Sequence, residues 1–122
     1  MIAVLVVEDS KNVQNVLADL FDAIGEFRIA ACVTTEVEAT AWLQQQHPGA
    51  WQLATIDLVL QEGSGFNLIQ RCRELGNGGH VVVLSDFVTP VIEARCRAMG
   101  ADAVFNKADV KGLTRYLEDL VR

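Results

Sequence analysis

MIAVLVVEDS, residues 1–10, decides the fold class. Residues 2–7 form an unbroken apolar run rich in β-branched side chains, which predicts a strand buried on both faces, as in a parallel sheet. Ser10 offers an N-cap for a helix, and Gly25 offers a place for that helix to end. The apolar residues between them recur with helical spacing and predict one buried stripe, made of Val13, Val16, Leu17, Leu20, Phe21 and Ile24.

This alternation of strand and helix returns four more times. Apolar runs predict further strands at 27–33, 53–60, 81–84 and 103–105. Within the first of these, apolar residues alternate with others at Phe27, Ile29, Ala31 and Val33, which is typical of a strand. Helices are expected to begin at the capping-box sequence 35–38, at the glycine-rich segment 63–65, at Pro90 and at Val110. The pattern predicts an α/β protein whose parallel sheet carries helices on both faces.

Length and composition limit the possible functions. With 122 residues, 51% of them hydrophobic, the chain is predicted to form one folded domain over 1–122. Ten Lys and Arg against 16 Asp and Glu give a net charge of −6, which opposes direct binding to nucleic acid. Three cysteines without CxxC spacing indicate neither a disulfide framework nor a zinc site. No apolar run approaches the ~20 residues of a membrane span, and none resembles a signal peptide, so a cytoplasmic protein is expected.

Polar residues follow the predicted strands at one edge of the sheet. Glu8 and Asp9 come after the first strand, Asp57 interrupts the third apolar run, Ser85 ends the fourth strand and Lys107 follows the fifth. Taken singly, each could be a helix cap or a solvated surface residue. Because ligands bind beyond the carboxyl ends of such strands, the common position of all five favours a functional site.

The three carboxylates point to a cation. Glu8, Asp9 and Asp57 would repel one another at one point, and burying them unpaired is costly. A divalent cation together with Lys107 relieves that repulsion. Since no His or Cys accompanies the acids, the donor set is oxygen only and suits Mg²⁺.

The chain resembles the response regulator receiver domain of two-component signalling over its whole length. The segments that carry the resemblance are VVEDS (6–10), TIDLVLQEGSG (55–65), VVVLSD (81–86) and GADAVFNKAD (100–109). The resemblance implies a doubly wound (βα)5 three-layer sandwich, flavodoxin-like and CheY-like, with parallel strand order 2-1-3-4-5.

The resemblance also implies roles for the strand-end residues. Asp57 is then the phosphoacceptor, Ser85 hydrogen-bonds the phosphoryl group and Lys107 pairs with it. The implied function is that of a phosphorelay receiver, not an enzyme acting on an external substrate. The implied partners are a sensor histidine kinase or histidine phosphotransfer protein as donor, and a downstream protein bound at the fourth helix, fifth strand and fifth helix.

The implied cofactor is Mg²⁺. The resemblance assigns it to Glu8, Asp9 and Asp57, with the backbone carbonyl of Val59 as a further ligand. These positions agree with the donor set that the strand ends predict on their own.

Three positions depart from the family pattern. Gln61 stands where the family usually has proline, and Ala108 replaces the proline that usually follows the lysine. Val104 occupies the place of the usual switch aromatic, with Phe105 next to it. Without an aromatic residue at 104, the family's usual coupling between Ser85 and an aromatic side chain is not expected here. None of the three positions takes part in the phosphorylation chemistry.

Apolar residues near the site predict an output surface and a slow decay. Phe87, Val88 and Val91 lie off the apolar stripe of the fourth helix and are expected to be exposed to a partner. By resemblance, Val59 and Phe87 border the path of the water that hydrolyses the acyl phosphate. Because neither side chain can orient that water, a comparatively long-lived phosphorylated state is expected.

Three alternative functions remain at this point. A flavodoxin-like cofactor binder would need a phosphate-binding loop after the first strand, where Glu8 and Asp9 would repel a phosphate. A phosphohydrolase with an aspartyl nucleophile would need a second Asp at the position of Val59. The third alternative is a receiver-like interaction module that works without phosphorylation.

Overall fold

The strands form a single parallel sheet. The computed structural model describes residues 1–75 and 78–122. Its strands pair in the order β2-β1-β3-β4-β5, which confirms the predicted topology. Their bounds are β1 Ile2–Val7, β2 Phe27–Val33, β3 Leu53–Asp57, β4 His80–Ser85 and β5 Ala103–Asn106.

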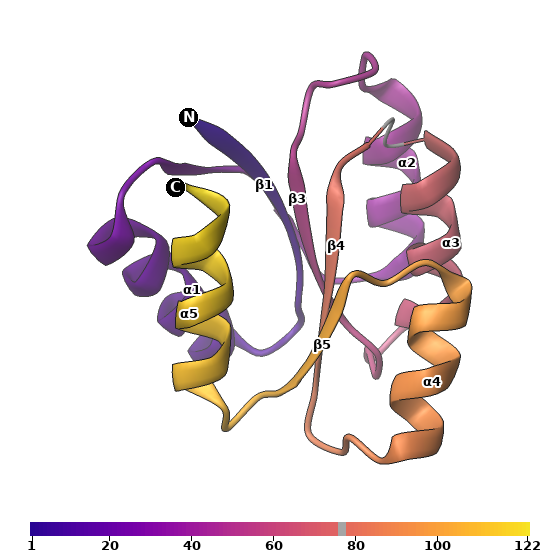
Figure 1. The fold of residues 1–122 in the computed structure, drawn as a ribbon. Coiled ribbons are helices and arrows are strands. Elements are labelled where there is room, and N and C mark those ends of the chain that lie inside the picture. The colour runs from indigo at the N-terminus through magenta and orange to yellow at the C-terminus, as the bar shows by residue number, and fades with distance from the viewer. Residues whose placement is uncertain (76–77) are drawn as a thin grey trace.

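Helices cover both faces of this sheet. Their bounds are α1 Lys11–Ile24, α2 Glu36–Gln45, α3 Gly65–Leu75, α4 Pro90–Met99 and α5 Val110–Leu120. Helices α1 and α5 lie together on one face, and α2, α3 and α4 lie on the other (Figure 1). The layers are those of the expected three-layer α/β sandwich.

Side-chain caps fix where most helices begin. Each cap is a hydroxyl or carboxylate oxygen that accepts the backbone N–H three residues further on; the caps are Ser10, Thr35, Thr89 and Asp109. Ser10 and the capping box at Thr35 were predictable from the sequence pattern. Pro90 occupies the first turn of α4, as expected.

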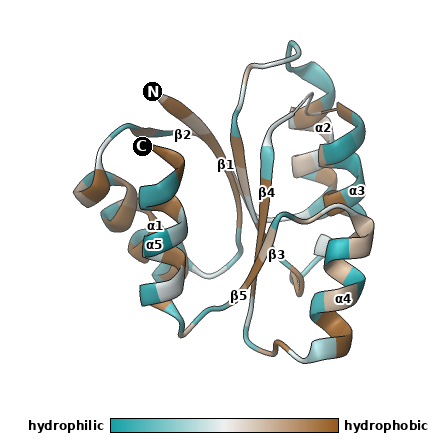
Figure 2. Cartoon of the chain, viewed as in Figure 1, coloured by the Kyte–Doolittle hydropathy of each residue, from teal (hydrophilic) through white to brown (hydrophobic). Residues whose placement is uncertain are grey.

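The sheet separates two apolar cores. Side chains alternate along β1, so that Leu5 and Val7 pack beneath α2, α3 and α4, while Val4 and Val6 pack beneath α1 and α5. The strands are largely brown in Figure 2 and the helices are striped, as expected for strands buried on both faces and amphipathic helices. Each fully buried Val or Leu contributes ~1.5–3 kcal/mol, so this double core carries much of the fold's stability.

The predicted second strand is confirmed as β2, but its alternating apolar residues do not share one face. The pairing of β1 with β2 shifts register between Val4 and Leu5, which leaves Ala30 as an extra residue in β2. This β-bulge reverses the direction of the side chains, so that Phe27 packs with α1 and α5 but Ala31 packs on the opposite face. Ile29, next to the bulge, is exposed.

Other expectations also need correction. Val16, predicted in the buried stripe, is 51% exposed, because α1 packs through Leu17 and Phe21. Of the apolar run 53–60, only the part up to Asp57 forms the third strand. Within the described ranges 1–75 and 78–122, no helix is long and apolar enough to cross a membrane.

Candidate functional site

The ends of β1, β3, β4 and β5 bring the predicted polar residues to one edge of the sheet. Asp57 is the last residue of β3, and Ser85 is the last residue of the neighbouring β4. Lys107 follows β5, and its backbone N–H donates to the Ser85 carbonyl over 2.9 Å. Glu8 follows β1 directly. The register of the parallel sheet therefore brings these polar side chains to one edge, as predicted from their positions after the strands.

Lys107 bridges two buried carboxylates. Its Nζ lies 3.1 Å from Glu8 Oε1 and 3.1 Å from Asp57 Oδ2. Desolvation lowers the pKa of Lys107, but hydrogen bonds to Asp57 and Glu8 outweigh it, so that the pKa is raised above its ordinary value. Lys107 is therefore a fixed positive charge at the centre of the site.

Glu8 is a buried carboxylate. Its Oε2 accepts the Ser10 backbone N–H over 3.0 Å, whereas its buried Oε1 lies 3.1 Å from the Lys107 ammonium. Burial raises the pKa of Glu8, the Ser10 N–H opposes that rise, and the charge of Asp57 adds to it. The buried Glu8 carboxylate therefore depends on positive charge from its neighbours.

The residues present fit a bound cation. One carboxylate oxygen each from Glu8, Asp9 and Asp57 lies within 4.8 Å of the others. Lys107 compensates one of the three negative charges, so that two remain for a cation to neutralise. The donors are all oxygen, which suits Mg²⁺ better than Zn²⁺ or copper.

Ser85 lies at the site, but its hydroxyl is turned toward the β4–α4 loop. Its Oγ donates to the Phe87 carbonyl over 3.1 Å and accepts the Phe87 N–H over 3.3 Å. The Ser85 hydroxyl must leave the Phe87 carbonyl before it can donate to a group on Asp57.

An apolar pocket of about 250 Å³ opens beside Asp57. Two of its lining side chains are largely exposed, Val59 at 76% and Phe87 at 77%. The lining residues are Asp57, Leu58, Val59, Phe66, Ser85, Asp86, Phe87 and Ile92. A group that approaches Asp57 through this opening meets mainly hydrocarbon.

Val104 and Phe105 lie on opposite faces of the sheet. Val104 is buried in the core beneath α2, α3 and α4. Phe105 packs in the other core, with its ring centroid 5.8 Å from that of Tyr116. Phe105 thus cannot substitute for an aromatic side chain at position 104 on the α4 side.

Two backbone amides at the site were not anticipated. The Gln61 N–H donates to Asp9 Oδ2 over 2.7 Å, and the Ser10 N–H holds Glu8. The one signal in the sequence was that residue 61 is not proline, since proline has no N–H to donate.

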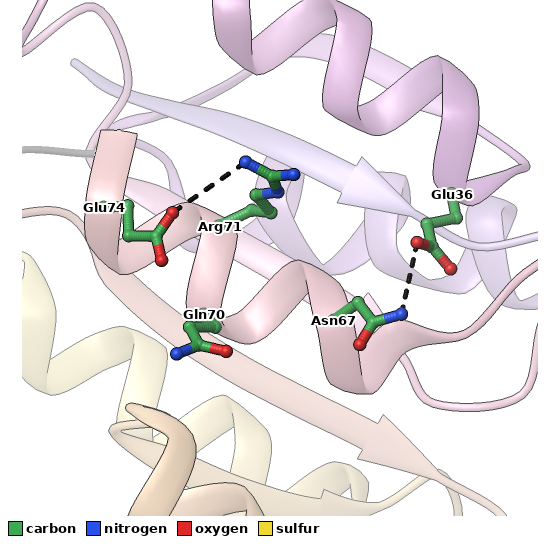
Figure 3. Close-up of a pocket in the computed structure, with 5 residues that line it drawn as sticks. All are labelled: Glu36, Asn67, Gln70, Arg71 and Glu74. Atoms are coloured by element: carbon green, nitrogen blue, oxygen red, sulfur yellow. Dashed lines mark hydrogen bonds and ion pairs between the residues drawn. The ribbon is translucent and has the colours of Figure 1, made fainter.

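A separate pocket of about 370 Å³ lies between α2 and α3 (Figure 3). Its polar side chains pair with one another, Asn67 with Glu36 and Arg71 with Glu74. These pairs lack the lysine and the buried carboxylates found near Asp57. The chemistry therefore concentrates at the strand ends.

Comparisons with known proteins agree with this arrangement. A family model described as response regulator receiver domain matches residues 4–118. A search of the curated proteins found no match. Among solved structures, the signal receiver domain of a DNA-binding response regulator from Colwellia psychrerythraea is similar at 19% identity and TM-score 0.86, covering 99% of this chain and 98% of that one.

Two further similar structures contain bound ions or ligands. A response regulator from Burkholderia pseudomallei, with a phosphorylated aspartic acid, calcium ion and citrate, shares 20% identity at TM-score 0.77, covering 99% of this chain and 73% of that one. The CheX–CheY–BeF3–Mg complex from Borrelia burgdorferi matches at 22% identity and TM-score 0.81, covering 99% of this chain and 90% of that one. At these low identities, the TM-scores of 0.77 to 0.86 show that the fold is shared.

Proposed function

Since the chain belongs to the response regulator receiver domain family, we propose that it receives a phosphoryl group on Asp57 from a histidine kinase or histidine phosphotransfer protein and passes the signal on through protein contacts. The single observation that carries this proposal is the buried Asp57 carboxylate, held 3.1 Å from Lys107 at the edge of an acidic cluster. The proposed unit is one receiver domain over residues 1–122.

The proposed reaction moves one phosphoryl group. A carboxylate oxygen of Asp57 attacks the phosphorus of a phosphohistidine, the phosphorus–nitrogen bond breaks, and its electron pair leaves with the imidazole. A carboxylate is a weak nucleophile, so the rate depends on positioning and on neutralised charge. Lys107, already within 3.1 Å of Asp57, is placed to pair with the incoming phosphoryl oxygens.

Ser85 acts after a local rearrangement in this proposal. Its hydroxyl exchanges the Phe87 carbonyl for a phosphoryl oxygen, which frees the Phe87 backbone. The change at Asp57 thereby reaches the β4–α4 loop.

Glu8, Asp9 and Asp57 would hold Mg²⁺, with the Val59 carbonyl as the further ligand expected from the family. When bound, the cation supplies charge neutralisation for the acceptor and phosphoryl oxygens. Two similar structures, one with a calcium ion and one with Mg, support a divalent cation here.

The test is phosphorylation by a small-molecule donor. Incubated with acetyl phosphate and Mg²⁺, the wild type should gain the mass of one phosphoryl group, and Asp57→Asn should gain none. Asp86→Asn is a matched control, because Asp86 is an exposed carboxylate at the same sheet edge. A phosphoryl group that persists in Asp57→Asn would move the acceptor elsewhere. No phosphorylation of the wild type would favour an interaction module that works without it.

The downstream partner is proposed to bind the face of α4, β5 and α5. Phe87 and Val91 near the start of α4 are 77% and 78% exposed, whereas Val88, expected to be exposed, is partly buried against the core. Amide chemical shifts measured with and without beryllofluoride should change in residues 86–106. Changes confined to the surroundings of Asp57 would contradict this route.

The phosphorylated state is proposed to decay slowly. Val59 and Phe87 flank the opening to Asp57, and neither can accept a proton from the attacking water. The double variant Val59→Asn with Phe87→Glu should lose phosphate faster once the donor is removed, because polar groups can then orient the water. Val91→Asn, an equally exposed position that does not line the pocket, is the control. An equal or slower decay in the double variant would show that these side chains do not control hydrolysis.

A further inference from the structure

The loop between β3 and α3, residues 58–64, is tied to carboxylates of two other elements. On one side, the Gln61 N–H donates to Asp9 Oδ2 over 2.7 Å, which links the loop to the end of β1. On the other side, the Ser64 N–H donates to Glu36 Oε1 over 2.8 Å, which links it to α2. The loop therefore has a fixed path between the acidic cluster and α2.

The contact at Gln61 is made by the backbone, not by the side chain. The Gln61 residue is exposed, and its amide nitrogen is the donor to Asp9. An N–H bonded to a carboxylate at 2.7 Å is short, as charge-assisted hydrogen bonds are. Any residue except proline supplies this donor. This chain therefore has a contact that a chain with proline at the same position lacks.

The bond joins two parts of the candidate cation site. Asp9 belongs to the acidic cluster, and the loop that Gln61 anchors also carries the Val59 carbonyl. The Gln61 N–H therefore holds a carboxylate that would be a ligand of the cation. Hydrogen bonds to ligating carboxylates orient them, and their loss typically weakens metal binding 10–100-fold.

We propose that the Gln61 amide is a positioning group for the cation site. It holds the Asp9 carboxylate and the loop that carries Val59 in a fixed position relative to each other before the cation binds. This inference rests on the Mg²⁺ site of the proposed function. It assigns a role to a residue that departs from the family pattern, and it requires that the Gln61–Asp9 bond persists when the cation binds.

The first test compares two variants of one position by calorimetric titration with Mg²⁺. Gln61→Ala keeps the backbone N–H and should bind Mg²⁺ like the wild type. Gln61→Pro removes the N–H and should bind about tenfold more weakly. Circular dichroism of each variant checks that the fold is retained. Equal binding by Gln61→Pro, or equal weakening in both variants, would overturn the positioning role.

The second test needs no proline variant, so it stands even if Gln61→Pro does not fold. Hydrogen exchange of the Gln61 amide should be slow in the metal-free wild type, fast in Asp9→Ala, and still slow in wild type saturated with Mg²⁺. Fast exchange on adding Mg²⁺ would show that the cation competes with the amide, which contradicts positioning. If the wild type gives no Mg²⁺ binding at all, the proposed cation site fails; if it binds and only the variants disagree, the role of Gln61 alone fails.

Discussion

Replacing Asp57 by Asn should stabilise the metal-free protein by about 1–2 kcal/mol, although it removes an ion pair. Asn keeps the shape of the side chain, and its carbonyl can still accept the Val59 N–H that now donates to Asp57 Oδ1. The substitution therefore changes charge with little change in packing. Asp57 is only 4% exposed, so its charge also carries a desolvation penalty that Asn does not.

The expected gain in stability follows from comparing the repulsion of Asp57 by the other two carboxylates with its attraction to Lys107. Asp57 lies within 4.8 Å of both Glu8 and Asp9, and each pair repels by about 3.5 kcal/mol at an effective dielectric constant of about 20. The pairing of Asp57 with Lys107 at 3.1 Å contributes about 5.4 kcal/mol of attraction on the same basis. The two repulsions exceed the attraction, and Lys107 retains Glu8 as its partner after the substitution.

Urea unfolding in EDTA measures this difference. Asp86→Asn, which removes an exposed carboxylate at the same edge, controls for the general effect of a lower net charge. Adding Mg²⁺ should stabilise the wild type more than Asp57→Asn, because the variant has lost one ligand. The difference in unfolding free energy between the two proteins should therefore become smaller. A metal-free Asp57→Asn that is less stable than the wild type would refute the reasoning, since pairing with Lys107 would then outweigh the repulsion.

Three further predictions concern packing, thiol reactivity and pH. Gly65→Ala should destabilise by about 3 kcal/mol in urea unfolding, because a Cβ there would lie 2.1 Å from the backbone oxygen of Asp57; wild-type stability would contradict this. Burial raises the pKa of Cys72 to about 12, so an aromatic disulfide reagent at pH 8 should modify the exposed Cys32 first and reach Cys72 only in denaturant; rapid native labelling of Cys72 would contradict its burial. Burial also raises the pKa of Glu8 above 4.5, so the folded state holds that proton more tightly than the unfolded state. The metal-free wild type should therefore gain stability relative to Glu8→Gln as the pH falls toward 4.5, and a constant difference would exclude the effect.

The strand-end chemistry was predictable because it depends on simple features of the sequence. Continuous apolar runs such as residues 2–7 predict strands buried on both faces, and parallel strands place the residues that follow them at one edge. Glu8, Asp57 and Lys107 therefore meet as expected. Their contacts require only that the strand order and register are right.

Other features depend on contacts that leave no pattern in the sequence. The bulge at Ala30 arises from how β2 pairs with β1, and the alternating sequence of 27–33 gives no sign of it. The direction of the Ser85 hydroxyl is set by the loop that follows it. The Gln61–Asp9 bond uses a backbone amide, which every residue but proline carries, so only the missing proline indicated it.

The bulge in β2 has a consequence for how the molecule behaves at high concentration. β2 and β5 are the two edges of the sheet, where unpaired N–H and C=O groups could pair with another molecule. The extra residue at Ala30 interrupts the regular row of these groups on β2 and increases the local twist. β5, at the other edge, is only four residues long. Neither edge offers a long flat template for edge-to-edge aggregation, so the sheet is protected against polymerising while its helices remain free to meet their partners.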